Sequence, residues 1–351
     1  MMKLVKLKDL KGNEILARPI MTSNYTELLA AGTILKKEYV SKIEMLGIDE
    51  VMIEENVGSL KKVLIMREDV KSSFREKVKS VIERHVYSDN KELKELTETA
   101  DSIITNILDN DEVVERIYDI RERSADIYEH SISVCSIAVL VAAKLRLSKE
   151  QMHDIGVASL FHDIGLRYLN FKYCEIDLDA LTNKELAEYK KHPVYAFTSL
   201  ENEPWISKNA KLMILNHHER LDGSGYPMHA KSMEIDSRIL EVVDAFDEMI
   251  CGIGCKRSRV YEAVEYLKAF KGKIFDENVV NTLLDFTAVY PAGSIVLLDT
   301  GETAVVERQN KQFPERPVLK IIKDAEGNSL SENKECDLLE VHNICIEKVI
   351  M

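Results

Sequence analysis

Apolar residues in the middle of the chain recur every three or four positions, which is the spacing of one face of a helix. This spacing predicts helices over residues 127–145, 149–165, 183–192, 209–219, 237–250 and 259–270. Only short breaks separate these segments. We therefore expect a mainly α fold in which residues 118–288 form a helical bundle core.

The N-terminal part of the chain has a mixed pattern. Short β-like runs surround one predicted helix at 36–46, so residues 1–70 are expected to form a small α+β module. Residues 71–117 hold two highly charged segments, 74–86 and 91–108, whose apolar residues lie three and four apart. They predict a helical connector with a break near residues 88–90.

The pattern changes again after Pro291. Runs rich in β-branched residues occur at 294–300, 303–308, 316–324 and 345–350, and Gly-containing turns lie between some of them. Such runs are typical of short strands. We expect residues 289–351 to form a small β-rich module.

Composition narrows the class of protein. With 351 residues, of which 45% are apolar, the chain can bury several cores. Charges interrupt the N-terminus and no run of roughly 18 apolar residues occurs, so we expect a cytoplasmic protein without a membrane partner. The net charge of −13 disfavours binding to a nucleic acid polymer. The dispersed cysteines indicate reduced thiols rather than a zinc site.

Histidine and aspartate provide the candidate chemistry. Five of the nine histidines, all in the helical segment, are candidates: His130, His162, His192, His217 and His218. Each alone would be interpreted as a core or surface residue, but the set also includes Asp163, directly after His162. Imidazole and carboxylate side chains together coordinate borderline metal ions that can activate a water molecule. The pattern predicts a site for two or three ions.

An aspartate on an apolar stripe supports this interpretation. Asp244 lies within LEVVDAFDEM, where an unpaired buried carboxylate would be costly, and a metal ion is the simplest compensation. Asp247, three residues later, is instead expected to be solvated or hydrogen-bonded. A second HDIG tetrapeptide begins at His153, near a predicted helix start, and is expected to lie at the surface. His85, His229 and His342 are expected to be structural.

These motifs resemble those of a known family. YEHS at 128–131, ASLFHDIG at 158–165, KKHPVYA at 190–196, NHHERLDGSGYP at 216–227 and RILEVVDAFD at 238–247 resemble the successive motifs of HD-GYP domains, a branch of the HD phosphohydrolase superfamily. The resemblance covers residues 118–288. It implies a metal-dependent phosphodiesterase that hydrolyses cyclic di-GMP to pGpG or GMP in bacterial second-messenger signalling, with iron or manganese.

The resemblance also implies the ligands and the catalytic residue. The metal ligands are His130, His162, Asp163, His192, His217, His218 and Asp244, and Asp163 is the expected catalytic residue. Some family members hold a third ion with a glutamate one helical turn before the first histidine. Asp126 occupies that position here. Because its side chain is shorter, two ions are favoured over three.

The expected substrate contacts depart from the family pattern. Leu166 stands where the family has a phosphate-binding lysine, and the neighbouring Arg167 points about 100° away on a helix. The basic stretch that follows in the family is replaced by a segment containing Arg257. We expect Arg167, Arg257 and Tyr226 to contact substrate.

The DGSGYP loop, which Gly223 and Gly225 allow to turn tightly, is expected to form a rigid wall beside the metals and a surface for signalling partners. Glu219 and Arg220 are expected to support it. A homodimer is a further option. The sequence leaves two alternatives open: hydrolysis of another cyclic dinucleotide or nucleotide, and a non-catalytic metal-bound interaction module.

Overall fold

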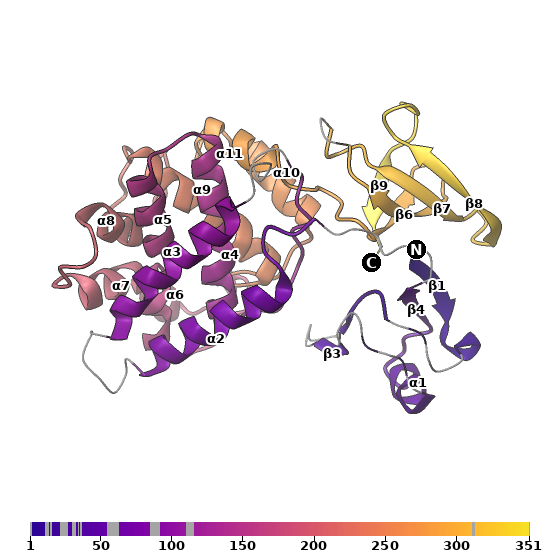
Figure 1. The fold of residues 1–351 in the computed structure, drawn as a ribbon, viewed down its shortest axis with the longest axis horizontal. Coiled ribbons are helices and arrows are strands. Elements are labelled where there is room, and N and C mark those ends of the chain that lie inside the picture. The colour runs from indigo at the N-terminus through magenta and orange to yellow at the C-terminus, as the bar shows by residue number, and fades with distance from the viewer. Residues whose placement is uncertain are drawn as a thin grey trace. The chain divides into compact units, whose positions relative to one another are not determined.

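The computed structural model describes residues 2–10, 14, 16–21, 27–29, 33, 35, 37–54, 63–84, 92–109, 116–310 and 313–350. They form two compact units (Figure 1). The helical unit comprises Val63–Pro291 with Asn310–Glu315, and the strand unit comprises Met1–Lys62, Ala292–Gln309 and Arg316–Met351. His85 and the predicted break at 88–90 lie outside the described residues.

The helical unit confirms the predicted helical core. Its helices are α2 (Glu68–Arg84), α3 (Glu95–Leu108), α4 (Ile127–Lys144), α5 (Lys149–Phe161), α6 (Asn183–Tyr189), α7 (His192–Leu200), α8 (Lys208–Asn216), α9 (Ile235–Cys251), α10 (Val260–Phe270) and α11 (Glu277–Leu284). α4 is the central helix, buried on all sides from His130 to Ala142. It packs mainly against α5 and α9.

The composition of α4 would also suit a membrane span. By length and hydropathy it is the one such candidate in the described part of the chain, and most of its side chains are buried inside the helical unit. Apolar side chains of the neighbouring helices surround it in a single core cluster. α4 is therefore the core helix of a globular unit.

Polar side chains fix where several helices begin. Ser148 and Gln151 form a reciprocal capping box at the start of α5, and Thr182 and Glu185 form another at α6. Ser207 caps α8 through the main-chain N–H of Ala210. These caps fix where α5, α6 and α8 begin, and His162, His192 and His217 follow the ends of these helices.

Three predicted helices end earlier than expected. The segment 209–219 is helical only to Asn216. The segment 149–165 is helical only to Phe161, and a 3-10 turn at Ile164–Tyr168 follows it. The segment 183–192 ends as a helix at Tyr189, and α7 begins at His192 with Pro193 in its first turn. His162, Asp163 and His192 therefore lie at helix junctions rather than inside helices.

The described residues of the strand unit form three antiparallel sheets. β1 (Met2–Lys6) pairs with β4 (Glu50–Glu54), and β2 (Ile20–Met21) pairs with β3 (Glu27–Leu29). The five-stranded sheet has the order β8-β7-β6-β5-β9, built from β5 (Ile295–Leu298), β6 (Thr303–Arg308), β7 (Val318–Lys323), β8 (Ser329–Asp337) and β9 (Ile346–Val349). Helix α1 (Lys37–Glu44) belongs to the N-terminal segment.

The two ends of the chain share one core. Buried Ala17 and Met52 from the N-terminal segment pack with Ile295 and Val305 from the C-terminal sheet. Lys323 Nζ lies 3.2 Å from the Glu50 carboxylate, which adds an ion pair between the two segments. The segments 1–70 and 289–351, which the sequence pattern separates into two modules, thus contribute to one compact unit.

Candidate metal centre

The predicted metal ligands, apart from Asp126, come together in the core of the helical unit. None is more than 4% exposed: His130, His162, Asp163, His192, His217, His218 and Asp244. His130 lies in the first turns of α4, and Asp244 lies in the middle of α9. The others occupy the helix ends and junctions after α5, before α7 and after α8.

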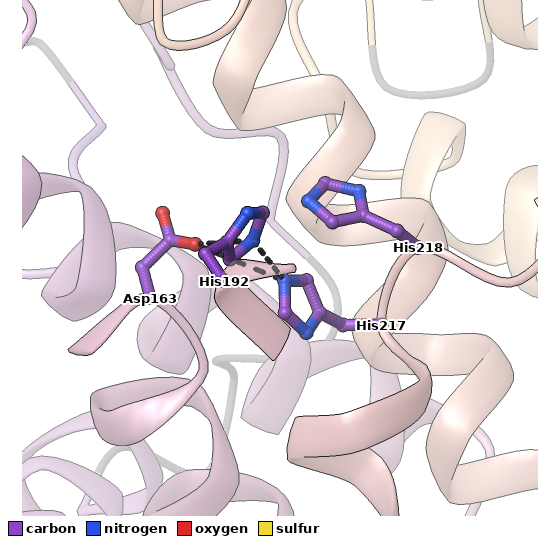
Figure 2. A group of neighbouring side chains, drawn as sticks. All are labelled: Asp163, His192, His217 and His218. Atoms are coloured by element: carbon purple, nitrogen blue, oxygen red, sulfur yellow. Dashed lines mark hydrogen bonds and ion pairs between the residues drawn. The ribbon is translucent and has the colours of Figure 1, made fainter. Parts of the chain in front are cut away.

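One group of ligands surrounds Asp163 (Figure 2). Its Oδ1 atom lies 3.3 Å from His192 Nε2 and 3.7 Å from His217 Nε2. The two imidazole Nε2 atoms are 3.1 Å apart. Figure 2 shows the Asp163 carboxylate and these two rings pointing toward one another, with the His218 ring beside them.

A second group surrounds Asp244. Its Oδ1 atom lies 3.1 Å from both His130 Nε2 and His162 Nε2, which are themselves 3.1 Å apart. The Oδ2 atom of Asp163 lies 3.5 Å from each of these nitrogens. Asp163 thus offers one oxygen to each group and bridges them.

Main-chain carbonyls orient three of the imidazoles. The Nδ1 atoms of His162, His192 and His217 lie 2.8, 2.8 and 2.7 Å from the carbonyl oxygen three residues earlier in the chain. A carbonyl can only accept a hydrogen bond, so each Nδ1 carries the proton. In the neutral form of each ring, the lone pair is then on Nε2, which faces the cluster.

These inward atoms fit a metal site. Two lone pairs that face each other at 3.1 Å repel one another, and a cation bound by both nitrogens would relieve this repulsion. Within the described part of the chain, Asp163 Oδ2, Asp244 Oδ2 and His218 Nε2 are buried without a hydrogen-bond partner, an arrangement that is costly unless a ligand satisfies it. Nitrogen and oxygen donors of this kind suit divalent first-row metals. The buried clusters therefore fit divalent metal binding.

Asp247 orients the fourth imidazole. It accepts a hydrogen bond from His130 Nδ1 at 2.7 Å and is also paired with the buried Arg123. It is therefore the hydrogen-bonding member of the pair of aspartates on α9. Burial alone would lower the pKa of His130, but its hydrogen bonds to Asp244 and Asp247 outweigh burial and hold that pKa well above the usual value.

His217 is affected in the opposite direction. Burial, together with repulsion from His162, lowers the pKa of His217 to about 3. Its imidazole is therefore neutral at physiological pH. Neutral imidazole is the form that binds a metal ion.

The structure does not bring Asp126 to the cluster. Asp126 Oδ1 accepts hydrogen bonds from the main-chain N–H groups of Tyr128 and Glu129, at 3.1 and 2.8 Å, and so caps α4. Its Oδ2 atom is paired with Arg75 on α2. Both carboxylate oxygens are engaged outside the metal centre.

Glu248 is an acidic neighbour of the centre that sequence reasoning missed. It lies one turn after Asp244 on α9, and its Oε1 atom is 3.9 Å from His218 Nε2. Burial, followed by repulsion from Asp244 and Asp163, raises the pKa of Glu248 well above its usual range. The spacing of four residues from Asp244 was the available signal, because such residues share a helix face.

The DGSGYP loop forms one wall of the site. The Tyr226 ring stacks on the His218 ring, with centroids 4.7 Å apart and planes inclined by 28°. A Cβ atom at Gly225 would lie 2.4 Å from the carbonyl oxygen of His218, so only glycine fits there. The Glu219 carboxylate accepts hydrogen bonds from the main-chain N–H groups of Met228 and Ala230, which fasten the end of the loop.

The predicted substrate contacts differ in their surroundings. Leu166 is buried in an apolar cluster, whereas Arg167 has a buried Nη1 atom with no hydrogen-bond partner in the described structure. Arg257 donates to the carbonyl oxygen of Arg123 at 2.7 Å and lies 3.3 Å from Glu175, so its guanidinium is engaged in packing. Lys190, which the sequence analysis did not select, lies over the Tyr226 ring at 5.6 Å from its centroid.

The remaining described histidines lie outside the cluster. His153 Nδ1 lies 2.6 Å from Asp101 on α3, and its side chain is 37% exposed. His229 and His342 are also exposed. The sequence analysis expected His153 at the surface and a structural role for His229 and His342, and it placed none of the three among the metal ligands.

Two family models match the chain. A model of the HD domain matches residues 88–279, and a model of a KOW domain associated with the HD domain matches residues 295–351. The first match spans the segment that holds the whole cluster. The second spans the C-terminal sheet.

Known proteins support the same assignment. A cyclic di-GMP phosphodiesterase of Pseudomonas aeruginosa is 28% identical over 197 residues, which is 55% of this chain and 47% of the relative. A cyclic di-GMP phosphodiesterase response regulator of Xanthomonas campestris is 34% identical over 153 residues, 42% of this chain and 40% of the relative. The chain therefore spans about half the length of the curated relatives it matches.

A solved structure shares the fold. An HDG"Y"P protein from Bdellovibrio bacteriovorus superimposes with a TM-score of 0.54 at 16% sequence identity, and covers 81% of this chain and 99% of that chain. At this identity the likeness concerns the fold alone. Together with the matched sequences, it confirms the resemblance inferred from the motifs.

Proposed function

This chain belongs to the HD domain family, and on that premise we propose that its helical unit is a divalent-metal-dependent phosphodiesterase that hydrolyses cyclic di-GMP. The observation that carries the proposal is the pair of ligand groups bridged by Asp163, in which imidazole Nε2 atoms face each other at 3.1 Å. The names of the relatives from Pseudomonas and Xanthomonas support the choice of substrate.

We propose two ions, one for each ligand group. Asp163, His192, His217 and His218 would hold one ion. His130, His162 and Asp244 would hold the other, with Asp163 shared between them. Iron or manganese suits these mixed nitrogen and oxygen donors.

Divalent ions bound here would lower the pKa of a water molecule and offset the negative charge that develops on phosphorus. The residues of the chain supply position. Asp163 fixes the separation of the two groups, since one oxygen faces each of them. The carbonyl oxygens and Asp247 hold the rings in the orientation that directs Nε2 inward.

Arg167 is the proposed phosphate contact. Its buried Nη1 atom has no hydrogen-bond partner in the described structure, so a phosphate oxygen could satisfy it. Tyr226, held against His218, would form the adjoining wall with Lys190 above it. Arg257 would act indirectly, because Glu175 and a carbonyl oxygen already occupy its guanidinium.

The test begins with protein purified under anaerobic, reducing conditions and analysed for metal content. Incubation with cyclic di-GMP, followed by chromatographic separation of pGpG and GMP, should show turnover that Asp163→Asn lowers at least about a hundredfold. Arg167→Met should raise KM, and His153→Ala is the matched control.

Three results would change the assignment. Protein that takes up no stoichiometric metal would overturn the ligand set. Turnover of a different cyclic dinucleotide alone would change the substrate. Metal-loaded protein that binds cyclic dinucleotides without hydrolysing any would leave a non-catalytic interaction module as the function.

A further inference from the structure

We propose that Glu241 on α9 is a positioning residue, which holds the ligand pair His217 and His218 in place through Arg220. The inference rests on the proposed function, because it gives one of the two ligand groups a support outside the metal centre. The sequence analysis assigned no role to Glu241. In the described part of the chain it also lies outside the groups that could hold an ion.

Glu241 is a buried acidic side chain that depends on one arginine. It lies three residues before Asp244 and is fully buried. Its Oε1 atom accepts a hydrogen bond from Arg220 Nη1 at 3.4 Å. Within the described residues, its Oε2 atom has no hydrogen-bond partner. Because a buried polar group without a partner is costly, the contact with Arg220 is the one that compensates this side chain.

Arg220 connects Glu241 to the end of α8. Its Nη1 atom also donates to the carbonyl oxygen of Glu219 at 3.0 Å and lies 3.5 Å from the carbonyl oxygen of His217. Carbonyl groups at the end of a helix lack partners within the helix, and a nearby arginine can satisfy them. Arg220 therefore binds the stretch of main chain that carries His217 and His218.

A second contact fixes the guanidinium of Arg220. It lies over the fully buried ring of Phe275, 5.0 Å from the ring centroid. The neighbouring main-chain N–H of Leu221 donates to the carbonyl oxygen of Ile274 at 3.1 Å. The Arg220 side chain is only 16% exposed, so water competes little for its hydrogen bonds. Phe275 and Glu241 together determine where the guanidinium lies.

This link spans the two elements whose separation matters to the ligands. Glu241 and Asp244 lie on the same helix, and Asp244 Oδ2 is 3.8 Å from His218 Nδ1. Arg220 follows His218 by two residues, so a contact between Arg220 and Glu241 sets the distance between the end of α8 and α9. A change in that distance would displace His217 and His218 relative to the ligands on other helices.

Glu241 acts as a hydrogen-bond acceptor more than as a charge. Burial raises the pKa of Glu241 to about 8, although the charge of Arg220 opposes this rise. The protonated form therefore predominates near neutral pH. Glutamine has the shape of protonated glutamate and keeps an accepting oxygen, whereas leucine fills a similar volume without any polar atom. Glu241→Gln and Glu241→Leu thus separate the hydrogen bond from the volume of the side chain.

The experiment measures metal affinity near neutral pH rather than turnover. Apo-protein is titrated anaerobically with Mn²⁺, and bound ions are followed by calorimetry and by electron paramagnetic resonance. We expect Glu241→Leu to weaken one of the two ions roughly ten- to a hundredfold, as is typical when the partner of a metal ligand is lost. The other ion, and both ions in Glu241→Gln, should stay within about threefold of the wild type.

Arg238→Met is the matched control. Arg238 also lies on α9 and pairs at 2.9 Å with Asp276, which caps α11. Among the described contacts, this pair does not include the main chain around His217. Its loss should lower the free energy of unfolding and leave both ion affinities unchanged. Hydrogen exchange of the apo-protein gives a second readout, because Glu241→Leu should deprotect residues 217–226 and Arg238→Met should not.

A double variant tests the route through Arg220. If Glu241 acts through Arg220, then Arg220→Met combined with Glu241→Leu should bind Mn²⁺ with the same affinity as Arg220→Met alone. Additive losses would show that Glu241 acts by another route and would overturn the inference.

The outcomes distinguish this inference from the proposed function. A wild type that binds two ions, together with unchanged affinities in Glu241→Leu, overturns the positioning role and leaves the two-ion centre intact. Equal losses in Glu241→Leu and Glu241→Gln, or in Glu241→Leu and Arg238→Met, also overturn it. A wild type that binds no ion overturns both.

A further variant covers the case in which Glu241→Leu fails to fold by circular dichroism. Glu241→Asp keeps the carboxyl group but withdraws it from Arg220 by one methylene. It should weaken the same ion, and unchanged ion affinities in this variant count against the positioning role.

Discussion

The tetrapeptide His-Asp-Ile-Gly occurs twice in this chain, at 153–156 and 162–165, and the two copies have opposite environments. His153 is 37% exposed and paired with Asp101 on α3. His162 is fully buried and faces His130 and Asp244. Nine residues correspond to two and a half helical turns, so the copies begin on opposite sides of the helix path.

The two copies differ because a motif at the end of its helix can face the metal centre, whereas the same motif inside the helix cannot. The first copy lies inside α5, where main-chain carbonyls are used by the helix itself. The second begins where α5 ends, so the carbonyl oxygen of Ser159 is free to accept from His162 Nδ1. Identical residues become a ligand pair only at the junction.

The largest expected effect separates the two aspartates. Asp163→Asn removes charge from the carboxylate that bridges both ligand groups, so hydrolysis of cyclic di-GMP should fall by on the order of 10²–10³-fold or more. Asp154→Asn, inside α5, should change the rate by less than about threefold. Steady-state assays at equal metal loading measure both, and equal losses would remove the distinction between the copies.

Removal of metal should loosen the backbone around the second copy, at 162–165, and leave the first copy unchanged. If the ions bind at a concentration about 1,000 times their Kd, a chelator should lower the free energy of unfolding by about 4 kcal/mol. Hydrogen exchange should then lose protection around residues 162–165 and 217–220, while residues 153–156 stay protected. Uniform loss of protection along α5 would contradict this expectation.

The glycines that end the two copies, Gly156 and Gly165, allow the same substitution to be compared at both sites. A Cβ atom at Gly165 would lie 2.0 Å from the carbonyl oxygen of His192, so Gly165→Ala must displace the backbone at the site. We expect a loss of about 3 kcal/mol in thermal or denaturant unfolding.

At Gly156 the new Cβ atom meets only side-chain atoms, of Ile104 at 3.2 Å, Ala100 at 3.4 Å and Cys135 at 3.7 Å. Alanine also favours the helix by up to about 1 kcal/mol, so Gly156→Ala should be close to neutral. If the two variants lose stability equally, the close contact at Gly165 does not constrain the site.

The smallest effect concerns His153. Its ion pair with Asp101 is exposed, and such pairs contribute less than about 1 kcal/mol. His153→Ala should therefore shift Tm by no more than a few degrees and leave metal content unchanged, as measured by differential scanning fluorimetry and elemental analysis. Loss of an ion in this variant would place the first copy in the metal centre.

The sequence predicted the helical core and which histidines and aspartates lie together, because both follow from local patterns. Apolar spacing located α4, α5 and α9, and the order of histidines and aspartates selected side chains that the fold brings together. Helix ends were less well predicted. The periodicity of 149–165 continues through His162, although the helix ends at Phe161.

The roles of Asp126 and Glu248 could not be predicted from local pattern. Asp126 has the spacing of a metal ligand, but its role depends on capping geometry and on Arg75, which lies 51 positions earlier. Glu248 is close to His218 only through the packing of α9 against the end of α8. Such choices arise from tertiary contacts that periodicity does not encode.

The hydrogen-bond acceptors that orient the imidazoles determine which substitutions the metal centre can tolerate during evolution. His162, His192 and His217 depend on carbonyl oxygens, which every amino acid possesses, so replacing Ser159, Tyr189 or Ile214 leaves the acceptor in place. His130 depends on the side chain of Asp247, which a single codon change can remove. Evolutionary drift can therefore alter the residues that precede three of the ligands, while selection must preserve Asp247.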